Sequence, residues 1–436
     1  MTRDREKYKF KHLFVLNKGL SITKENLKYE GIPCVNYGEI HSRYGFEIIP
    51  ETDVLKCVDK DFLSHSPKSL LQHGDFVFAD TSEDIAGSGN FTYLNSDTNI
   101  FAGYHTIVAR SRKPQNYRYI AYYFDSINFR SQIQKSVNGV KVYSITQTIL
   151  KNTTIELPDE SVQDQIVRFL DWKVSQINKL INVRKKQIGL LQEKKQQIIN
   201  KAFNSCNDKW ELKPLKFWAD SNLRSLGENN SDNFEFDYID ISSIGHGYVK
   251  QYPVRHVFSE APLRARRIVK YGDTIISTVR TYLRSVCFIN HDIEHCIVST
   301  GFSVLTPKAN YVLPELLSYA LSTDRFIDEV VSNSIGVSYP AISDNRLMNL
   351  KIALPKDINT QLLIYNELIK QFTILDKTID NLDWEIKLFT EYRIRLISDV
   401  VTGKLDVRDV VVPEFEKVEG VVEEESGECE EMEVDE

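Results

Sequence analysis

The chain has 436 residues, enough for roughly two to four domains with buried cores. It carries 54 basic and 61 acidic residues, and the net charge of −7 disfavours a polyanionic partner such as nucleic acid when it is taken as an average. The average is misleading, because residues 414–436 hold twelve acidic residues against the single base Lys417 and leave +4 on residues 1–413. We therefore expect an acidic disordered tail at residues 409–436 behind an ordered, mildly basic body.

The rest of the composition is that of an ordered cytoplasmic protein. No apolar run approaches the roughly 18 to 20 residues that a membrane span needs, and the charged first eleven residues lead into no signal-peptide core. The six cysteines are scattered without a close pair, so we expect reduced thiols and no metal site built from them.

The chain contains an internal repeat. Short segments recur at a nearly constant offset of 197–198 residues, and strand-like runs follow the first matched pair in both copies. The matched pairs are Gly74 and Asp75 with Gly272 and Asp273, Gly139 and Val140 with Gly336 and Val337, and Leu157 and Pro158 with Leu354 and Pro355. The sequence thus predicts one globular design built twice.

A long heptad segment follows each copy. Apolar positions alternate in steps of three and four, a period of 3.5 that is typical of the seam of a coiled coil. The predicted seam residues are Leu170, Val174, Ile177, Ile181, Ile188 and Leu191 in the first segment and Leu368, Phe372, Leu375, Ile379, Ile386 and Phe389 in the second. One such helix cannot bury its seam alone, so the two helices pair antiparallel, pair with another subunit, or do both.

These elements predict an α+β architecture of two globular mixed α/β domains and two long helices that form an antiparallel coiled coil. The expected domains are residues 1–157, helix 158–206, residues 207–354, helix 355–408 and the tail 409–436. Two similar domains on a stiff rod suit two sites on one long ligand. Duplex DNA is the natural candidate, because half-site spacing must match the protein's own repeat.

The entry into each helix carries a recognisable motif. Leu157 and Pro158 are followed by Gln163 and Ile166, and the second copy repeats these residues. The motif resembles the helix entry of the specificity subunits of type I restriction–modification systems, and residues 396–406 resemble the helix end of that family. The resemblance covers about residues 10–408. The chain departs from the pattern at Val162, where the family usually carries Glu, and in its acidic tail.

This resemblance implies a function. In the family, two target-recognition domains each read one half of a bipartite, asymmetric DNA sequence, and the coiled coil docks two modification subunits, which restriction subunits join. The chain is then a non-catalytic subunit of a type I restriction endonuclease and adenine-specific methyltransferase complex. It binds no cofactor itself, and S-adenosylmethionine, ATP and magnesium belong to the partners. The alternatives are a recognition subunit of another restriction–modification type and a coiled-coil adaptor that binds no DNA.

Catalytic motifs are missing or misplaced. The sequence has no Pro-Pro pair for an adenine methylase loop, and residues 402–404 lack most of a phosphate-binding loop. Asp159, Asp171 and Lys173 match a nuclease pattern, but the last two lie inside the heptad helix. His291, Glu294 and His295 match a zinc pattern that needs one helix face, whereas this segment links two strand-like runs.

Arginine and lysine provide the DNA-binding candidates, since guanidinium groups read guanine edges and both side chains contact phosphates. Each of these residues has an alternative interpretation as an ordinary surface charge. The candidates are Arg264, Arg266, Arg267, Arg280 and Arg284 in the second copy and Arg110, Arg112 and Lys113 in the first.

Overall fold

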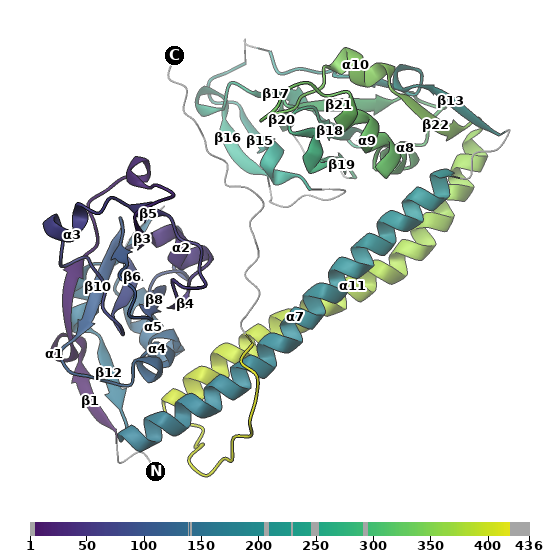
Figure 1. Ribbon diagram of the computed structural model, residues 1–436. Coiled ribbons are helices and arrows are strands. Elements are labelled where there is room, and N and C mark those ends of the chain that lie inside the picture. The colour runs from purple at the N-terminus through teal and green to yellow at the C-terminus, as the bar shows by residue number, and fades with distance from the viewer. Residues whose placement is uncertain are drawn as a thin grey trace. The chain divides into compact units, whose positions relative to one another are not determined.

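The computed structural model describes residues 5–137, 139, 142–204, 209–227, 230–245, 253–290 and 295–418. Two long helices and two strand-rich modules account for most of these residues (Figure 1). The chain divides into two compact units, one made of Met1–Lys186 with Asp383–Glu436 and the other of Gln187–Leu382. Module one denotes residues 5–157 of the first unit, and module two denotes residues 209–355 of the second.

A five-stranded sheet forms the centre of module one, in the order β2, β10, β6, β8, β4. All four residues of its central strand β6 (Phe76–Ala79) are buried, as expected for a strand covered on both faces. Phe76 packs its ring 4.9 Å from that of Phe124 in helix α4 (Tyr117–Asp125). On the other face, Val77 and Ala79 share a core cluster with Ile40 of α2 (Tyr37–Ser42).

The other elements of module one surround this sheet. They are β1 (Glu6–Lys9), α1 (Phe10–Leu13), β2 (Phe14–Lys18), β3 (Ile32–Val35), β4 (Phe46–Ile48), β5 (Cys57–Val58), α3 (Phe62–His65), β7 (Thr81–Ser82), β8 (Phe91–Leu94), β9 (Phe101–Ala102), β10 (Thr106–Ser111), α5 (Ile127–Gln134), β11 (Tyr143–Ser144), α6 (Gln147–Asn152) and β12 (Thr154–Leu157). Side-chain caps set several helix starts; for example, Asn116 accepts from the Tyr119 amide at the start of α4.

Module two contains two four-stranded sheets, in the orders β14, β21, β18, β19 and β16, β15, β20, β17. Ile276 of the buried strand β18 (Thr274–Ser277) packs with helix α8 (Pro314–Leu321), and the neighbouring Ile275 packs with Val298 of the second sheet. The remaining elements are β13 (Trp210–Pro214), β14 (Ala219–Ser221), β15 (Glu235–Ile239), β16 (Val254–Val257), β17 (Ala265–Ile268), β19 (Val286–Phe288), β20 (Cys296–Ser299), β21 (Phe302–Pro307), α9 (Asp324–Ser332), α10 (Asp344–Asn349) and β22 (Lys351–Pro355).

The two modules share one strand order. β2, β10, β6 and β8 of module one correspond to β14, β21, β18 and β19 of module two. Each module closes with an antiparallel pair, β1 with β12 and β13 with β22, and the second strand of each pair leads directly into a long helix. The expected α+β architecture of two repeated modules with two long helices is therefore confirmed.

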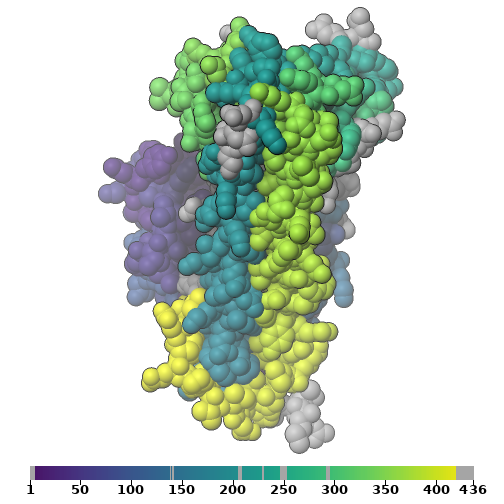
Figure 2. All heavy atoms as spheres, turned by 90° about the vertical axis from the view of Figure 1, so that its right-hand side faces the viewer, coloured from purple at the N-terminus to yellow at the C-terminus, as the bar shows by residue number. Residues whose placement is uncertain are grey.

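The long helices are α7 (Glu160–Asn204) and α11 (Ile358–Val401), and they run antiparallel within each unit. In the first unit Arg184 Nε donates to Glu385 at 2.6 Å and Arg393 Nη1 donates to Asn178 at 2.7 Å. Since a higher number on α7 faces a lower one on α11, the directions are opposite. In the second unit, the 2.5 Å contact of Lys195 with Asp376 continues the same register. Figure 2 shows the helices side by side, α7 in teal and α11 in green to yellow.

The second helix ends earlier than the expected residue 408. Gly403 adopts φ 75, and its amide donates to Val400 O at 3.0 Å. A glycine in the left-handed region after the last turn is a common helix terminator. The expected boundary lies past this stop because residues 396–406 together resemble the helix end of the family.

Part of the expected disordered tail, which was predicted from residue 409, is packed against the body of the chain. Residues 409–418 are described, and Val410 and Val412 pack against the core cluster that contains Leu170 and Val407. The remaining residues of the expected tail, 419–436, lie outside the described residues. Among the helices that the structure describes, none is long and apolar enough to cross a bilayer.

A buried seam residue should contribute more stability than an exposed leucine on the same helix. Leu170 is fully buried whereas Leu180 is 43% exposed. We expect Leu170→Ala to lower the free energy of unfolding by about 2 to 5 kcal/mol through cavity formation, and Leu180→Ala by about 0.5 kcal/mol or less. Urea titration followed by circular dichroism measures both, and equal losses would contradict this packing.

Candidate nucleic-acid interface

All twelve predicted seam residues are buried or half-buried. Leu170, Ile177, Ile181, Leu368, Phe372 and Leu375 are buried, and Val174, Ile188, Leu191, Ile379, Ile386 and Phe389 are half-buried. In the first unit Ile177 and Ile181 belong to the same core cluster as Leu396 of α11. In the second unit Leu368 and Phe372 share a cluster with Ile199 of α7. The seam therefore holds the two helices to each other in both units.

Each module keeps one buried aspartate that an arginine neutralises. Arg110 donates from Nε and Nη2 to both oxygens of Asp75 at 2.6 to 3.1 Å. In module two Asp273 occupies the matching position and is paired with Arg224. An unpaired buried carboxylate would be costly, so these arginines stabilise the fold. The charge of Arg110 is thereby balanced within the module.

The arginine candidates of module two differ in their surroundings. Arg267 donates to the Phe302 carbonyl and, at 3.0 Å, to Asp344. Arg284 forms an ion pair with Asp324. These two guanidinium groups are tied to the module's own oxygens, which leaves less of their charge for a ligand.

The remaining candidates lie nearer to solvent. Arg266 is half-buried, with its guanidinium 5.8 Å from the ring centroid of Phe258, and Arg280 lies 4.6 Å from the ring centroid of Tyr339. The exposed members are Arg264, Arg112 and Lys113. The structure thus divides the eight candidates into internal partners and surface side chains.

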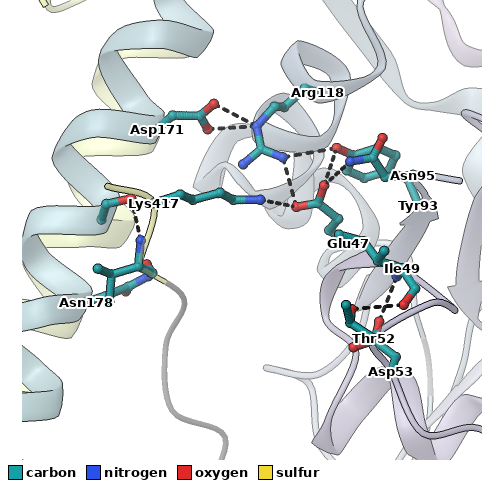
Figure 3. Close-up of polar contacts among 12 residues, drawn as sticks. Glu47, Ile49, Thr52, Asp53, Tyr93, Asn95, Arg118, Asp171, Asn178 and Lys417 are labelled. Carbon is teal, nitrogen blue, oxygen red and sulfur yellow. Dashed lines mark hydrogen bonds and ion pairs between the residues drawn. The ribbon is translucent and has the colours of Figure 1, made fainter. Parts of the chain in front are cut away.

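A charged cluster attaches module one to helix α7 (Figure 3). Arg118 of α4 donates from Nε to both oxygens of Asp171 at 2.7 and 2.9 Å, and from Nη1 to Glu47 at 2.9 Å. The Tyr122 hydroxyl donates to the same Asp171 at 2.6 Å. On the other side of the cluster Lys417 donates to Glu47 at 2.9 Å. We call Glu47, Arg118, Asp171 and Lys417 the charge hub.

The hub keeps Glu47 ionised. Burial by itself would raise the pKa of Glu47, but the charges of Arg118 and Lys417 outweigh it and lower this pKa from 4.5 to about 2. Burial likewise acts to lower the pKa of Arg118, and the surrounding Asp171, Tyr122, Tyr93 and Glu47 raise it above its ordinary value. Glu47 and Arg118 therefore form a full ion pair at neutral pH.

The C-terminal segment, residues 404–418, runs along the same helix. Gln165 donates to the carbonyls of Val407 and Val410 at 3.0 and 2.7 Å, and Asn178 donates to the Val418 carbonyl at 3.1 Å. Together with module one and the helices, this segment lines a cavity of about 740 Å³ whose walls include Arg118, Asp171, Lys417 and Val418. The segment thus connects the end of α11 back to module one.

Module two uses different chemistry to reach helix α7. Asn200 donates from Nδ2 to Asp324 at 2.5 Å and accepts the Asp324 amide at 3.0 Å. Gln196 donates to the Ser322 carbonyl at 2.9 Å. The donors on the helix side are neutral amides here, in contrast to the ionic contact of Arg118 with Asp171.

One side of the helix pair in the first unit is apolar and exposed. It consists of Leu180 and Val183 on α7 and Leu388 and Tyr392 on α11, which are 43% to 55% exposed. In the heptad these residues occupy c and g positions, which lie on the same side of an antiparallel pair. Exposed apolar side chains gathered in this way are typical of a surface that another protein covers. We call these four residues the apolar face.

Comparison with known proteins identifies one region of the chain. Residues 3–190 match the family described as the type I restriction modification DNA specificity domain. The matched region is such a specificity domain. The resemblance of the chain to type I specificity subunits is thereby confirmed.

Two curated relatives of the specificity domain support this assignment. The type I restriction enzyme HindI specificity subunit of Haemophilus influenzae is 27% identical over 170 residues, which cover 37% of this chain and 36% of that protein. The MjaVIII specificity subunit of Methanocaldococcus jannaschii is 23% identical over 327 residues, or 66% of this chain and 71% of that protein. The aligned part of the chain thus spans about a third of the first relative.

The fold of the full chain also has a solved counterpart. A chain from a structure on the complex assembly and conformational transition of the type I R-M system covers 92% of this chain and 99% of its own length. The TM-score is 0.59 at 17% identity. This likeness shows that the fold of most of the chain is already known from a solved structure.

Sequence reasoning about the specificity domain missed the charge hub. Arg118 belongs to no sequence motif and Asp171 fits only the nuclease pattern, whereas the structure joins the two residues. Their spacing in the sequence gives no sign of the contact. The available signal was the position of Asp171 directly after the seam residue Leu170. A carboxylate so close to a buried seam needs a partner.

The nuclease pattern is not supported by the described residues. There, no group of three or more His, Cys, Asp or Glu side chains could hold a metal ion. Asp171 instead binds Arg118, as the helical context of the nuclease pattern indicates. His291 and Glu294 of the zinc pattern lie outside the described residues.

The hub predicts a pH-dependent contribution to stability. The pKa of Glu47 is lowered in the folded state. Its contribution to the stability of the fold is therefore complete above pH 4.5 and is lost as the pH falls toward about 2. We expect Glu47→Gln to lower the free energy of unfolding by about 1 to 3 kcal/mol at pH 7, and the difference from wild type to shrink between pH 4.5 and 3. Urea titrations at several pH values measure it.

The exposed Glu25 provides the matched control. Glu25→Gln removes a carboxylate of the same module and should change stability by about 0.5 kcal/mol or less at any of these pH values. A Glu47→Gln effect that stayed constant down to pH 3 would contradict the ionic role of Glu47.

Proposed function

We propose that the chain is the DNA sequence-specificity subunit of a type I restriction–modification complex. The observation that carries this proposal is the repeat of one strand order in two modules, each of which leads into one of two antiparallel helices. A duplex has a fixed spacing along its axis, so a protein with two reading modules selects a bipartite sequence. Because the modules differ in sequence, the two half-sequences differ as well.

Modification subunits are the proposed partners of the helix pair. The apolar face supplies two leucines, a valine and a tyrosine on adjacent helices, a surface that accepts the apolar stripe of a partner helix. Restriction subunits join the assembly through these partners. S-adenosylmethionine, ATP and magnesium act in the partner subunits, and the role of this chain is to bind and position DNA.

Much of the phosphate neutralisation is expected from those partners. Residues 1–413 carry a net charge of only +4. Arg110, Arg267 and Arg284 form ion pairs with carboxylates of their own modules. The complex should therefore bind DNA more tightly and with a steeper salt dependence than the isolated chain. A coiled-coil adaptor without a DNA target would show neither property.

Exchange of module two tests the bipartite reading. The complex of this chain with its cognate modification partner should methylate adenines within a two-part sequence. Replacement of residues 207–354 with another recognition module should change one half-sequence and leave the other half unchanged. Methylation mapping by sequencing measures both, and a contiguous or absent motif in the wild type would overturn the proposal.

A charge on the apolar face tests partner docking. We expect Leu388→Glu to weaken assembly with the modification subunit by at least about tenfold, because a carboxylate would be buried in the contact. Lys387→Glu adds a carboxylate one residue away, at heptad position b, and should leave assembly within about twofold. Size-exclusion chromatography and titration calorimetry measure the two, and equal affinities would show that the partner binds elsewhere.

A further inference from the structure

Module two holds a strained turn at its surface. Arg280 and Arg284 have φ values of 52 and 57, and they flank the short 3-10 turn Thr281–Leu283. Residues with a side chain rarely adopt this left-handed conformation, and each one costs about 1 kcal/mol or more. The surrounding structure must therefore hold the turn in place.

A hairpin formed by residues 335–341 fixes the turn. Ile335 and Ala341 exchange amide-to-carbonyl hydrogen bonds of 2.8 and 2.9 Å, and Gly336 has a φ of 119 at the bend. The Arg280 amide donates to the Pro340 carbonyl at 2.8 Å, and the hydroxyls of Thr281 and Ser334 are 2.8 Å apart. Turn and hairpin thus form one rigid surface feature.

The hairpin directs apolar side chains into solvent. Val337 at its tip is 100% exposed, and Ile335, Tyr339 and Tyr282 are each more than half exposed. Burial in the module would be the favourable state for such side chains. A rigid segment that keeps them outside is typical of a surface for a ligand.

The charge around the hairpin favours an anionic ligand. Residues 333–343 contain no charged side chain, and residues 278–283 of the turn contain Arg280 and no acidic residue, while Arg284 is paired with Asp324. The Arg280 guanidinium lies 4.6 Å from the centroid of the Tyr339 ring, so it is held beside the tip. An apolar tip next to an oriented guanidinium matches the edges of DNA bases, where thymine offers a methyl group and guanine offers two acceptors.

Module one has a matching strand pair with other chemistry. β7 pairs with β11, with Ser82 opposite Tyr143, just as Val279 bridges to Ala341 in module two. In the sequence, Gly139 and Val140 match Gly336 and Val337. Residues 83–85, which follow Ser82, are Glu, Asp and Ile, whereas residues 280–282, which follow Val279, are Arg, Thr and Tyr.

A constant frame with exchanged side chains is what two readers of different half-sequences require. We propose that the hairpin of residues 335–341 enters a groove of duplex DNA, where Val337 contacts a base edge and Arg280 lies beside it. This inference rests on the proposed function and adds the element that does the reading in module two. The groove must admit a closed loop of seven residues, so the wide major groove is the one that fits.

The test uses the complete chain assembled with its modification partner and the methylated sequence mapped for the wild type. Val337→Ala should weaken DNA binding about 3- to 10-fold and relax one base position in the half-sequence read by module two. Val337→Glu should weaken binding at least about 30-fold, because a carboxylate would meet the negative groove. Since Val337 touches no core residue, both variants should fold.

Val411 is the matched control, because it is 88% exposed and lies outside both modules. Val411→Ala and Val411→Glu should bind DNA within about twofold of the wild type. A wild type that reads a bipartite motif while both Val337 variants keep its motif and affinity would overturn this inference alone. Loss of base preference in the other half-sequence would also overturn it. A wild type without any bipartite motif would instead remove the proposed function.

Discussion

The seam between α7 and α11 is the contact on which the rest of the molecule depends. Each helix has 44 or 45 residues with an apolar stripe that no single helix can bury. Pairing removes Leu170 and Ile177 from water in one unit and Leu368 and Phe372 in the other. Polar contacts at Arg184 and Lys195 then select the antiparallel register. The strand pair β1 with β12 leads into α7, and the pair β13 with β22 leads into α11. Each module therefore ends where one of the paired helices begins.

The heptad and the repeat were predictable because both depend on residues close in sequence. Steps of three and four predicted two helices, and the shared Gly-Asp and Leu-Pro pairs predicted two similar modules. The sheet order in each module follows from that repeat. The second sheet of module two did not, although its strands β16, β15 and β20 pair in the same directions as β5, β3 and β9 of module one. Gly403 indicated in the sequence that the second helix ends near residue 401, but the family motif, which continues to residue 406, led to a later boundary.

The candidate site was less predictable, because a positive charge has the same appearance in sequence whether it faces DNA or a carboxylate. Arg110 and Arg267 were candidates for DNA, yet they bind Asp75 and Asp344. The carboxylates that neutralise them lie 35 and 77 residues away. Lys417 was predicted to lie in a disordered acidic tail, although it forms an ion pair with Glu47 in module one. Only the three-dimensional pairing separates internal bases from surface ones.

The two modules are attached to α7 by unlike bonds. Arg118 holds module one through full charges, whereas Asn200 and Gln196 hold module two through neutral amides. The carboxylates that hold Arg118 are only 10% and 19% exposed, so dissolved ions screen this contact little. Module one should therefore keep its orientation on its part of α7 in dilute and in concentrated salt alike.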